Sequence, residues 1–340
     1  MADLFADLLG QEQACALMTA ALERGRIAPA YLLAGPEGVG RRLGALRFLE
    51  GVLAGPAGAA ALRRRLEQGN HPDLLWVEPT YQHQGRLIPA SRALEEGVNR
   101  RTAPQLRLEQ VREVSRFLAR RPVEAPRCLV VLEAAEAMAE AAANALLKTL
   151  EEPGDGLLLL LCAAPEQLLS TIRSRCQLIP FRRLPPELVA QVLAAVPPAA
   201  EEDQPEAGQQ PEAGEQPEVG KQPRSPRPDP PELVEMAAGS PGALLQHRRQ
   251  WQALPEGLAD RLLALGRDPL DALALARDLS EALDGEQQLW LLNWWQLALW
   301  RRQPGREQPL RRLEQLRRQL LAYVQPRLAW EVALLQLGRG

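Results

Sequence analysis

Short, uninterrupted apolar runs alternate with amphipathic segments through the first half of the chain. A strand buried on both faces of a parallel sheet reads as a continuous apolar run, whereas apolar residues spaced three and four apart indicate a helix. The predicted strands cover residues 30–34, 71–77, 128–132, 156–163 and 178–181. The predicted helices cover residues 10–26, 41–53, 108–119, 139–150 and 186–196. Strands that alternate with helices predict an α/β layered domain with a mainly parallel sheet.

The pattern is interrupted twice. Residues 78–104 form a polar excursion, and residues 197–231 contain three degenerate copies of a Gln-Pro-Glu repeat. The repeat segment is almost free of large apolar residues, so it cannot bury enough surface to offset the entropy of ordering. It is predicted to be a disordered insertion, with an interaction motif as the alternative. From residue 233 to the end, every segment reads as helical.

Four tryptophans fall in one predicted helix near the end of the chain. Trp290, Trp294, Trp295 and Trp300 lie among apolar residues on almost every side of the helix at residues 289–300. That distribution indicates a helix buried within a bundle. A row of tryptophans can also stack on nucleic-acid bases, but the nearby basic residues do not alternate with the rings. The bundle interior is the favoured interpretation.

The composition is that of an ordinary globular protein. A chain of 340 residues exceeds the usual single-domain size, so two or three domains are expected. The net charge of −3 gives no overall argument for binding nucleic acid or membrane. The apolar runs are too short to span a bilayer and no signal peptide is visible, so a cytoplasmic location is expected. Lys148 and Lys221 are the only lysines, so one arginine in place of a lysine is weak evidence of lost function.

The cysteines give no indication of a metal site. Cys15, Cys128, Cys162 and Cys176 are scattered and form no C-x-x-C pair. They indicate neither a disulfide framework nor a zinc cluster, and isolated thiols in a reducing compartment are expected. No bound metal is predicted.

A glycine-rich loop follows the first predicted strand and opens the next helix. Residues 35–42 read G-P-E-G-V-G-R-R. In a working phosphate loop, a lysine contacts the β- and γ-phosphates and a hydroxyl contacts Mg²⁺, but here Arg41 takes the lysine position and Arg42 the hydroxyl position. The loop glycines are Gly35, Gly38 and Gly40. They are predicted to form a tight turn, with residual binding of nucleotide or phosphate at the helix N-terminus as the alternative.

A second nucleotide-handling element is expected where an apolar strand ends in carboxylates. Residues 129–136 read L-V-V-L-E-A-A-E, whereas active ATPases of this architecture have four apolar residues followed by Asp-Glu-Ala-Asp. Glu133 takes the place of the carboxylate that assists Mg²⁺, and Ala134 takes the place of the one that activates water. Alanine can neither accept a proton nor orient water. ATP hydrolysis by this chain alone is therefore not expected, and no cofactor is predicted.

Two further motifs carry a family resemblance. Residues 144–153 read N-A-L-L-K-T-L-E-E-P, and residues 171–176 read T-I-R-S-R-C. Together they resemble the clamp-loader branch of the AAA+ ATPases, whose fold is a P-loop-type α/β module with a parallel sheet. Within that branch, residues 5–12 and 27–33 are similar to the bacterial delta-prime family, and the polar excursion is similar to that of cyanobacterial members. The resemblance covers residues 1–195 strongly, residues 231–245 moderately, and the end of the chain only in helical character.

The resemblance implies a role for one surface turn. In the family, a Ser-Arg-Cys motif supplies an arginine finger to the ATP held by the neighbouring motor subunit, and the motif maps onto Ser174, Arg175 and Cys176. A guanidinium inserted in trans stabilises charge on the transferring phosphate. The alternative for Arg175 is a surface ion pair.

The chain departs from its active relatives at further positions. Active members carry a phosphate-sensing arginine after Gly-Ser-Pro, whereas residues 239–242 read G-S-P-G, so Gly242 replaces that arginine. No polar sensor residue ends the strand near Ala163 and Ala164. Many delta-prime proteins carry a cysteine-ligated zinc module in the stretch corresponding to residues 54–70, which has no cysteine here.

The resemblance implies three domains and a place in an assembly. The domains are a degenerate AAA+ module (1–185), a helical lid that contains the insertion (186–245), and an all-α collar for oligomerisation (246–340). The implied role is that of a non-catalytic subunit beside gamma/tau motor subunits and a delta subunit, in a loader that places the sliding clamp on primed DNA for the replicative polymerase. Weak contacts with the DNA backbone are expected through Arg107, Arg112 or helix N-termini. The alternatives are an autonomous gamma/tau-type motor ATPase and an AAA+-derived scaffold unrelated to replication.

Overall fold

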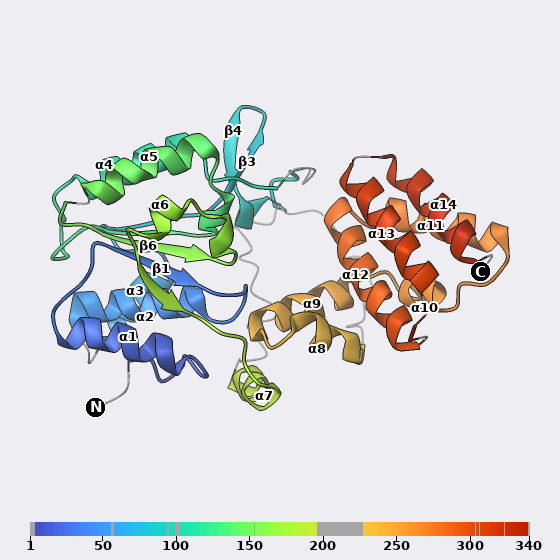
Figure 1. The fold of residues 1–340 in the computed structure, drawn as a ribbon, viewed down its shortest axis with the longest axis horizontal. Coiled ribbons are helices and arrows are strands. Elements are labelled where there is room, and N and C mark those ends of the chain that lie inside the picture. Colours follow the sequence, from blue (N-terminus) through green and yellow to red (C-terminus); the bar gives the residue numbers. More distant parts are fainter. Residues whose placement is uncertain are drawn as a thin grey trace, which may run out of the picture. The chain divides into compact units, whose positions relative to one another are not determined.

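The chain forms two compact units in the computed structural model (Figure 1). The structure describes residues 4–55, 58–93, 95–98, 103–152, 154–195, 227–302, 304–305, 307–322 and 324–338. The first unit comprises residues 1–189 and 239–243, and the second comprises residues 190–238 and 244–340.

The first unit is built on a five-stranded parallel sheet. Its strands are β1 (Ala30–Ala34), β2 (Leu74–Val77), β5 (Leu129–Leu132), β6 (Leu157–Cys162) and β7 (Gln177–Pro180), in the order β2-β5-β6-β1-β7. Leu32 at the centre of β1 lies opposite Leu160 of β6 on one side and Leu178 of β7 on the other. The carboxyl ends of β1, β5 and β6 therefore meet at one edge, which is where sheets of this kind bind ligands.

Helices cover both faces of this sheet (Figure 1). One face packs against α1 (Glu12–Glu23), α2 (Arg41–Ala54) and α3 (Ala60–Glu67), and the other against α4 (Leu108–Leu118), α5 (Glu140–Glu151) and α6 (Ser170–Arg173). Leu157, Leu159 and Leu161 of β6 join the first core. Leu158 and Leu160 join the second. Because successive side chains enter opposite cores, every residue of β6 is buried and the run is apolar throughout.

The predicted α/β layered domain with a mainly parallel sheet is confirmed. The largest differences in bounds are at residues 10–26, where α1 covers Glu12–Glu23, and at residues 71–77, where β2 covers Leu74–Val77. The remaining elements are η2 (Ala135–Ala137), η3 (Pro165–Gln167) and α7 (Pro186–Ala195), which crosses the boundary between the units.

The polar excursion between β2 and α4 contains a hairpin that the apolar pattern does not predict. Strands β3 (Thr80–His83) and β4 (Arg86–Pro89) pair antiparallel, and η1 (Ala90–Arg92) follows them. Gln84 and Gly85 connect the strands and both have positive φ, as two-residue hairpin loops require. The Gln-Gly pair was the available signal, but the polar composition of the flanking residues obscured it.

The second unit is helical throughout its described elements. It contains α8 (Pro231–Ala237), most of α9 (Pro241–Ala253), α10 (Leu258–Leu263), α11 (Pro269–Ala282), α12 (Gly285–Arg302), α13 (Glu307–Leu321) and α14 (Pro326–Gly338). Helix α14 packs against α11 and α13, and α12 packs against α10 and α13. No helix among the described residues is both long and apolar enough to cross a membrane. The predicted insertion, residues 197–231, lies outside the described residues up to residue 226.

The tryptophan-rich helix is α12, and its interior position is confirmed for three of the rings. Trp290 is buried, and Trp294 and Trp295 are each 1% exposed. Trp295 stacks on Trp330 of α14. The prediction is wrong for Trp300, which is 47% exposed. Trp300 lies in the last turn of α12 beside two exposed arginines, so the apolar pattern of the helix extends beyond its buried part.

Candidate functional site

The glycine loop joins β1 to α2 at the carboxyl edge of the sheet. Gly38 has a φ of 73° and Gly40 a φ of 102°, conformations that glycine adopts without strain. A Cβ added at Gly35 would lie 2.3 Å from the carbonyl oxygen of Phe181, so a side chain does not fit there. The three glycines together make a tight strand-to-helix turn.

A cavity of about 550 Å³ lies beside this loop. The residues of interest in its lining are Gly38, Gly40, Arg41, Arg42, Glu133, Ala134, Glu136 and Ala163. The structure thus brings the glycine loop, both arginines and the end of β5 together, as the strand order requires. Gly35 is not part of the lining. The cavity is the place where a nucleotide would bind in an active relative.

The position of the missing magnesium ligands is filled by an ion pair. Nη1 of Arg42 donates to Oε1 of Glu133, and Nε1 of Trp76 donates to the same oxygen at 2.7 Å. The Arg42 guanidinium also lies over the Trp76 ring, 4.5 Å from its centroid, in a cation–π arrangement. The carboxylate of Glu133 is therefore engaged by two donors from its own chain.

These residues do not fit a magnesium-bound triphosphate. Mg²⁺ requires oxygen ligands, and a phosphate loop supplies one of them as the hydroxyl at the position of Arg42. Here that position carries a positive charge, which repels a cation and pairs with Glu133. Ala134 lines the cavity with only a methyl group. Positions 42 and 134 therefore supply neither the hydroxyl ligand nor the base that ATP hydrolysis uses in an active relative.

Arg41 lies in a more buried environment at the same cavity. Burial lowers the pKa of Arg41, and the negative charge of Glu136 opposes this shift. Its Nη1 atom is buried and has no hydrogen-bond partner among the described residues. Glu136 in turn accepts a hydrogen bond from the backbone of Ala163 at 2.9 Å. Burial, with the charge of Glu136, raises the pKa of the Cys162 thiol to about 12. An unused donor on Arg41 keeps a small anion possible as a ligand, without a metal.

The loop is also tied to residues 239–243, the segment that opens α9. The backbone nitrogen of Gly242 donates to the carbonyl oxygen of Gly38 at 2.9 Å. The Ser240 hydroxyl donates to the carbonyl oxygen of Glu37. A Cβ added at Gly242 would lie 2.8 Å from the Cα of Gly38. A side chain at position 242, such as the phosphate-sensing arginine of active relatives, would therefore meet the backbone of Gly38.

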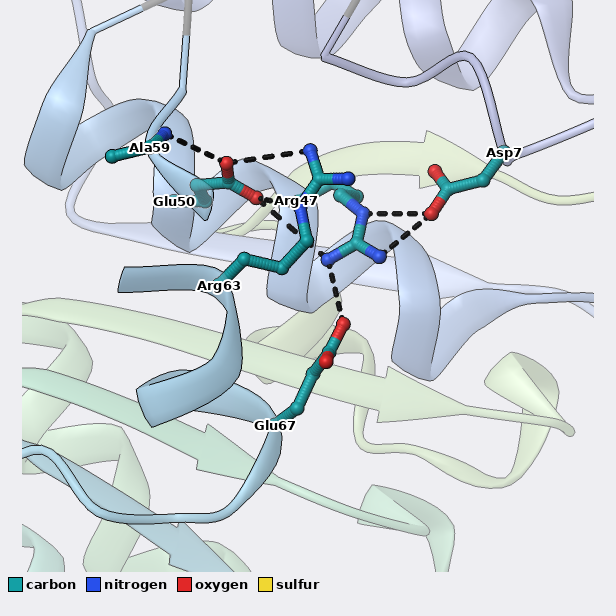
Figure 2. A network of polar contacts seen from close by, with 6 residues as sticks. All are labelled: Asp7, Arg47, Glu50, Ala59, Arg63 and Glu67. Atoms are coloured by element: carbon teal, nitrogen blue, oxygen red, sulfur yellow. Dashed lines mark hydrogen bonds and ion pairs between the residues drawn. The ribbon is translucent and has the colours of Figure 1, made fainter. Parts of the chain in front are cut away.

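A network of charged residues holds α3 against α2 (Figure 2). Its members are Asp7, Arg47, Glu50, Ala59, Arg63 and Glu67. Glu50 is 1% exposed and accepts hydrogen bonds at 2.9 Å from the Ala59 backbone and from Nε of Arg63. Arg47 donates to Glu67 at 3.0 Å. This network lies at the stretch where many family members carry zinc, and these residues do not fit a cysteine-ligated metal. Within the described residues, no group of three or more His, Cys, Asp or Glu is placed to hold a metal ion.

The Ser174-Arg175-Cys176 motif forms a turn between α6 and β7 and does not line the loop cavity. The Ser174 hydroxyl donates to the carbonyl oxygen of Thr171 at 3.1 Å. Cys176 is half-buried against the second core, and burial raises the pKa of its thiol to about 11. The cysteine therefore packs as a protonated thiol, and Arg175 is the residue of the motif that carries charge.

The Arg175 side chain makes two contacts with its own chain. Its Nη2 donates to Oε1 of Glu151 at 2.8 Å, and its Nη1 donates to the carbonyl oxygen of Thr171 at 3.0 Å. The side chain remains 37% exposed. The surface ion pair considered as the alternative for Arg175 is thus present, and it leaves part of the guanidinium accessible.

A second, basic cavity lies between α4 and α5, with a volume of about 710 Å³. Arg112 lines it together with Arg116, Lys148 and one acidic residue, Glu152. We call this surface the α4–α5 groove. Arg107, the other arginine expected to contact DNA, precedes α4 and is not part of the groove lining. Helical spacing places Arg112 and Arg116 on one face of α4, so this cluster was open to prediction from the sequence.

Sequence reasoning missed Trp76 and Glu151. Trp76 reaches Glu133 because β2 pairs with β5, with Trp76 opposite Val131. No short-range pattern reveals that pairing. Glu151 belongs to a quoted motif, but only the packing of α5 against α6 shows that it meets Arg175.

The fold and the cavity together define a class of protein. A parallel sheet of this order, with a glycine loop after β1 and an acidic turn after β5, is a P-loop-type AAA+ module, and a helical region follows it. A solved DNA polymerase III gamma subunit-related protein from Thermotoga maritima has a similar fold. The matched region covers 96% of this chain and 99% of the Thermotoga maritima chain, with a TM-score of 0.52 and a sequence identity of 16%.

Sequence comparisons identify the family. Residues 10–185 match the model of the DNA polymerase III delta subunit. Residues 219–337 match the model of the cyanobacterial DNA polymerase III delta prime C-terminal domain. The chain belongs to the DNA polymerase III delta-prime family.

Individual relatives agree with this placement. The DNA polymerase III delta-prime subunit of Pseudomonas aeruginosa is 38% identical over 160 residues, which are 45% of this chain and 43% of the relative. That of Bacillus subtilis is 30% identical over 185 residues, 53% of this chain and 50% of the relative. The gamma/tau subunit of Mycobacterium tuberculosis is 30% identical over 199 residues, 56% of this chain and 31% of the relative. The chain thus spans about half the length of the curated delta-prime relatives it matches.

Proposed function

We propose that this chain is a non-catalytic subunit of a clamp loader and supplies Arg175 in trans to ATP held by a neighbouring motor subunit. The observation that carries the proposal is the Arg42–Glu133 ion pair at the position of the magnesium ligands. A chain that cannot hold Mg²⁺ there does not hydrolyse ATP itself. The Arg175 turn lies outside this cavity. Loss of the residues for ATP hydrolysis in this chain's own cavity therefore leaves the Arg175 turn intact.

The proposed partners follow from the family. Motor subunits of the gamma/tau type and a delta subunit complete the loader, which opens the sliding clamp and places it on primed DNA during replication. Within the chain, the proposal keeps the AAA+ module at residues 1–185, the lid at 186–245 and the oligomerising collar at 246–340. A role in replication also keeps the expectation of a cytoplasmic location.

Contacts with DNA are assigned to the phosphate backbone, through the α4–α5 groove. Arg112, Arg116 and Lys148 place three cations along it beside one carboxylate, that of Glu152. Cations of this kind position a protein on a duplex without reading its sequence. The contact is weak because the chain as a whole carries a net charge of −3.

The alternative is an autonomous motor ATPase of the gamma/tau type, which the 30% identity to the Mycobacterium tuberculosis gamma/tau subunit favours. It requires Mg²⁺-dependent ATP turnover by the isolated chain. We expect no turnover above that of a heat-denatured sample. A turnover rate in the ordinary range for enzymes of about 1 s⁻¹ or more would replace the proposal with this alternative.

A reconstituted loader tests the proposal directly. Arg175→Ala is compared with Arg173→Ala, an exposed arginine two residues away in the same turn region. We expect Arg175→Ala to slow hydrolysis at the contacted motor site by about a thousandfold, since arginine fingers have effects of that size, while assembly measured by gel filtration is unchanged. Arg173→Ala should leave both unchanged. Equal hydrolysis by both variants would overturn the proposal.

A further inference from the structure

The backbone around Arg175 is fixed by hydrogen bonds within the turn and by burial of a neighbouring residue. The nitrogen of Arg175 donates to the carbonyl oxygen of Ile172 at 3.1 Å, and that of Cys176 donates to Arg173 at 3.3 Å. Ile172 is fully buried in the second core. The main chain thus places the Cα of Arg175, and the remaining freedom lies in its long side chain.

Two oxygens limit that remaining freedom. One is the carbonyl oxygen of Thr171, 3.0 Å from Nη1, which belongs to the same turn. The other is Oε1 of Glu151, 2.8 Å from Nη2, which comes from the last residue of α5. An oxygen on each terminal nitrogen fixes both the direction and the plane of the guanidinium.

We propose that Glu151 is a positioning residue for Arg175, which holds the guanidinium ready for a phosphate on the neighbouring subunit. A guanidinium has five N–H donors, and Thr171 and Glu151 take one each. Among the described residues, the Nε donor and one donor on each terminal nitrogen have no hydrogen-bond partner. The inference rests on the proposed trans role of Arg175.

Positioning accounts for the geometry better than sequestration. Arginine loses a large side-chain entropy when it is ordered, so a side chain already held in place loses less when it meets its target. The pair is partly exposed, with 37% of the Arg175 and 53% of the Glu151 side chain accessible. An exposed pair shifts an equilibrium by only about fivefold at most, which is too little to keep Arg175 from a multiply charged phosphate.

The test uses the reconstituted loader with the full-length chain. Glu151→Ala removes the anchor, and Glu151→Gln keeps an oxygen acceptor without the charge. Glu140→Ala is the matched control, because Glu140 lies on the same helix, is exposed, and lines neither the loop cavity nor the α4–α5 groove. Each variant is also made on the Arg175→Ala background. The readouts are kcat and KM for ATP of the Arg175-dependent hydrolysis, and assembly by gel filtration.

We expect Glu151→Ala to lower kcat about threefold with KM unchanged, because the loss affects a contact made in the transition state. Glu151→Gln should recover part of the loss, and Glu140→Ala should match the parent chain. On the Arg175→Ala background, Glu151→Ala should have no further effect, as expected for two residues that act through one contact.

The outcomes separate the two claims. If Arg175→Ala leaves hydrolysis unchanged, the proposed trans role fails. If Arg175→Ala abolishes the activity but Glu151→Ala leaves kcat unchanged or raises it, the positioning role alone is overturned. A loss that persists on the Arg175→Ala background, or that accompanies poor assembly, also overturns it, since it would assign Glu151 a structural role.

Discussion

Two of the arginine–glutamate pairs in the first unit lie in regions to which we assign opposite uses. Arg42 pairs with Glu133 inside the loop cavity, and Arg175 pairs with Glu151 on a turn outside it. Both arginines are exposed to solvent, since the Arg42 side chain is 60% exposed and the Arg175 side chain is 37% exposed. The two pairs differ in whether they stand at positions that hold a ligand in active relatives.

The Arg42–Glu133 pair joins the start of α2 to the end of β5, the two elements that present magnesium ligands in an active relative. Each partner cancels the charge of the other, so the pair does not fit a bound Mg²⁺. The Arg175–Glu151 pair joins the end of α5 to a surface turn, where no ligand set is displaced. Under the proposed function, the same chemistry closes one site and prepares another, which is the division expected of a subunit that assists a neighbour.

The network in Figure 2 gives a reference for ion pairs that do not line the loop cavity. Glu50→Ala leaves Arg63 and the Ala59 backbone without their buried acceptor. We expect the free energy of unfolding to fall by about 3 kcal/mol, the cost of breaking a buried pair, measured by chemical denaturation. Glu67→Ala, which removes a 41% exposed partner of Arg47, should cost less than about 1 kcal/mol. Equal losses would show that burial does not govern these pairs.

The thiol of Cys176, next to Arg175, should be unreactive, which would leave Arg175 as the charged residue of the motif. Burial raises the pKa of Cys176 from 9.0 to about 11, so the thiolate fraction at pH 8 falls by about a hundredfold. Because a raised pKa moves the thiolate to higher pH, alkylation of Cys176 should keep rising with pH beyond pH 9. Peptide-level mass spectrometry after iodoacetamide treatment measures the rate, with the urea-unfolded chain as control. A rate equal to that of the unfolded chain would contradict the packed thiol.

A substitution at Gly242 tests the contact between the glycine loop and residues 239–242. Gly242→Arg restores the residue type of active relatives but places a Cβ 2.8 Å from the Cα of Gly38. We expect a loss of about 1–3 kcal/mol in the free energy of unfolding, typical of overpacking, and no gain of nucleotide binding by equilibrium dialysis. Gly266→Ala is the control, since a Cβ there meets no atom within 4 Å. Nucleotide binding by Gly242→Arg would show that the cavity is closed by this glycine and not by the Arg42–Glu133 pair.

The parallel sheet could be predicted because its strands are buried on both faces, which makes each one a continuous apolar run. The β3–β4 hairpin could not be found in this way, since only part of its surface is covered and its residues are mostly polar. At Trp300 the sequence predicts burial that the structure does not show, because the apolar pattern of α12 continues past the buried part of the helix.

The candidate site also contains residues that the sequence predicts and residues that only the structure shows. Its residues could be named from motifs with fixed spacing, including Arg42, Glu133 and Arg175. Their partners could not be named, because Trp76 and Glu151 reach them through strand order and helix packing, over separations that no local pattern encodes. The missing arginine at Gly242 was visible in the sequence, but the backbone contact that accounts for it was not.

The most direct measurement of the central claim compares Arg42→Ala with Arg175→Ala in the same reconstituted loader, by single-turnover ATP hydrolysis. If the chain acts in trans, Arg42→Ala leaves hydrolysis by the assembly unchanged, and Arg175→Ala slows the contacted site by about a thousandfold. The opposite pattern, with hydrolysis lost in Arg42→Ala and kept in Arg175→Ala, would contradict the account.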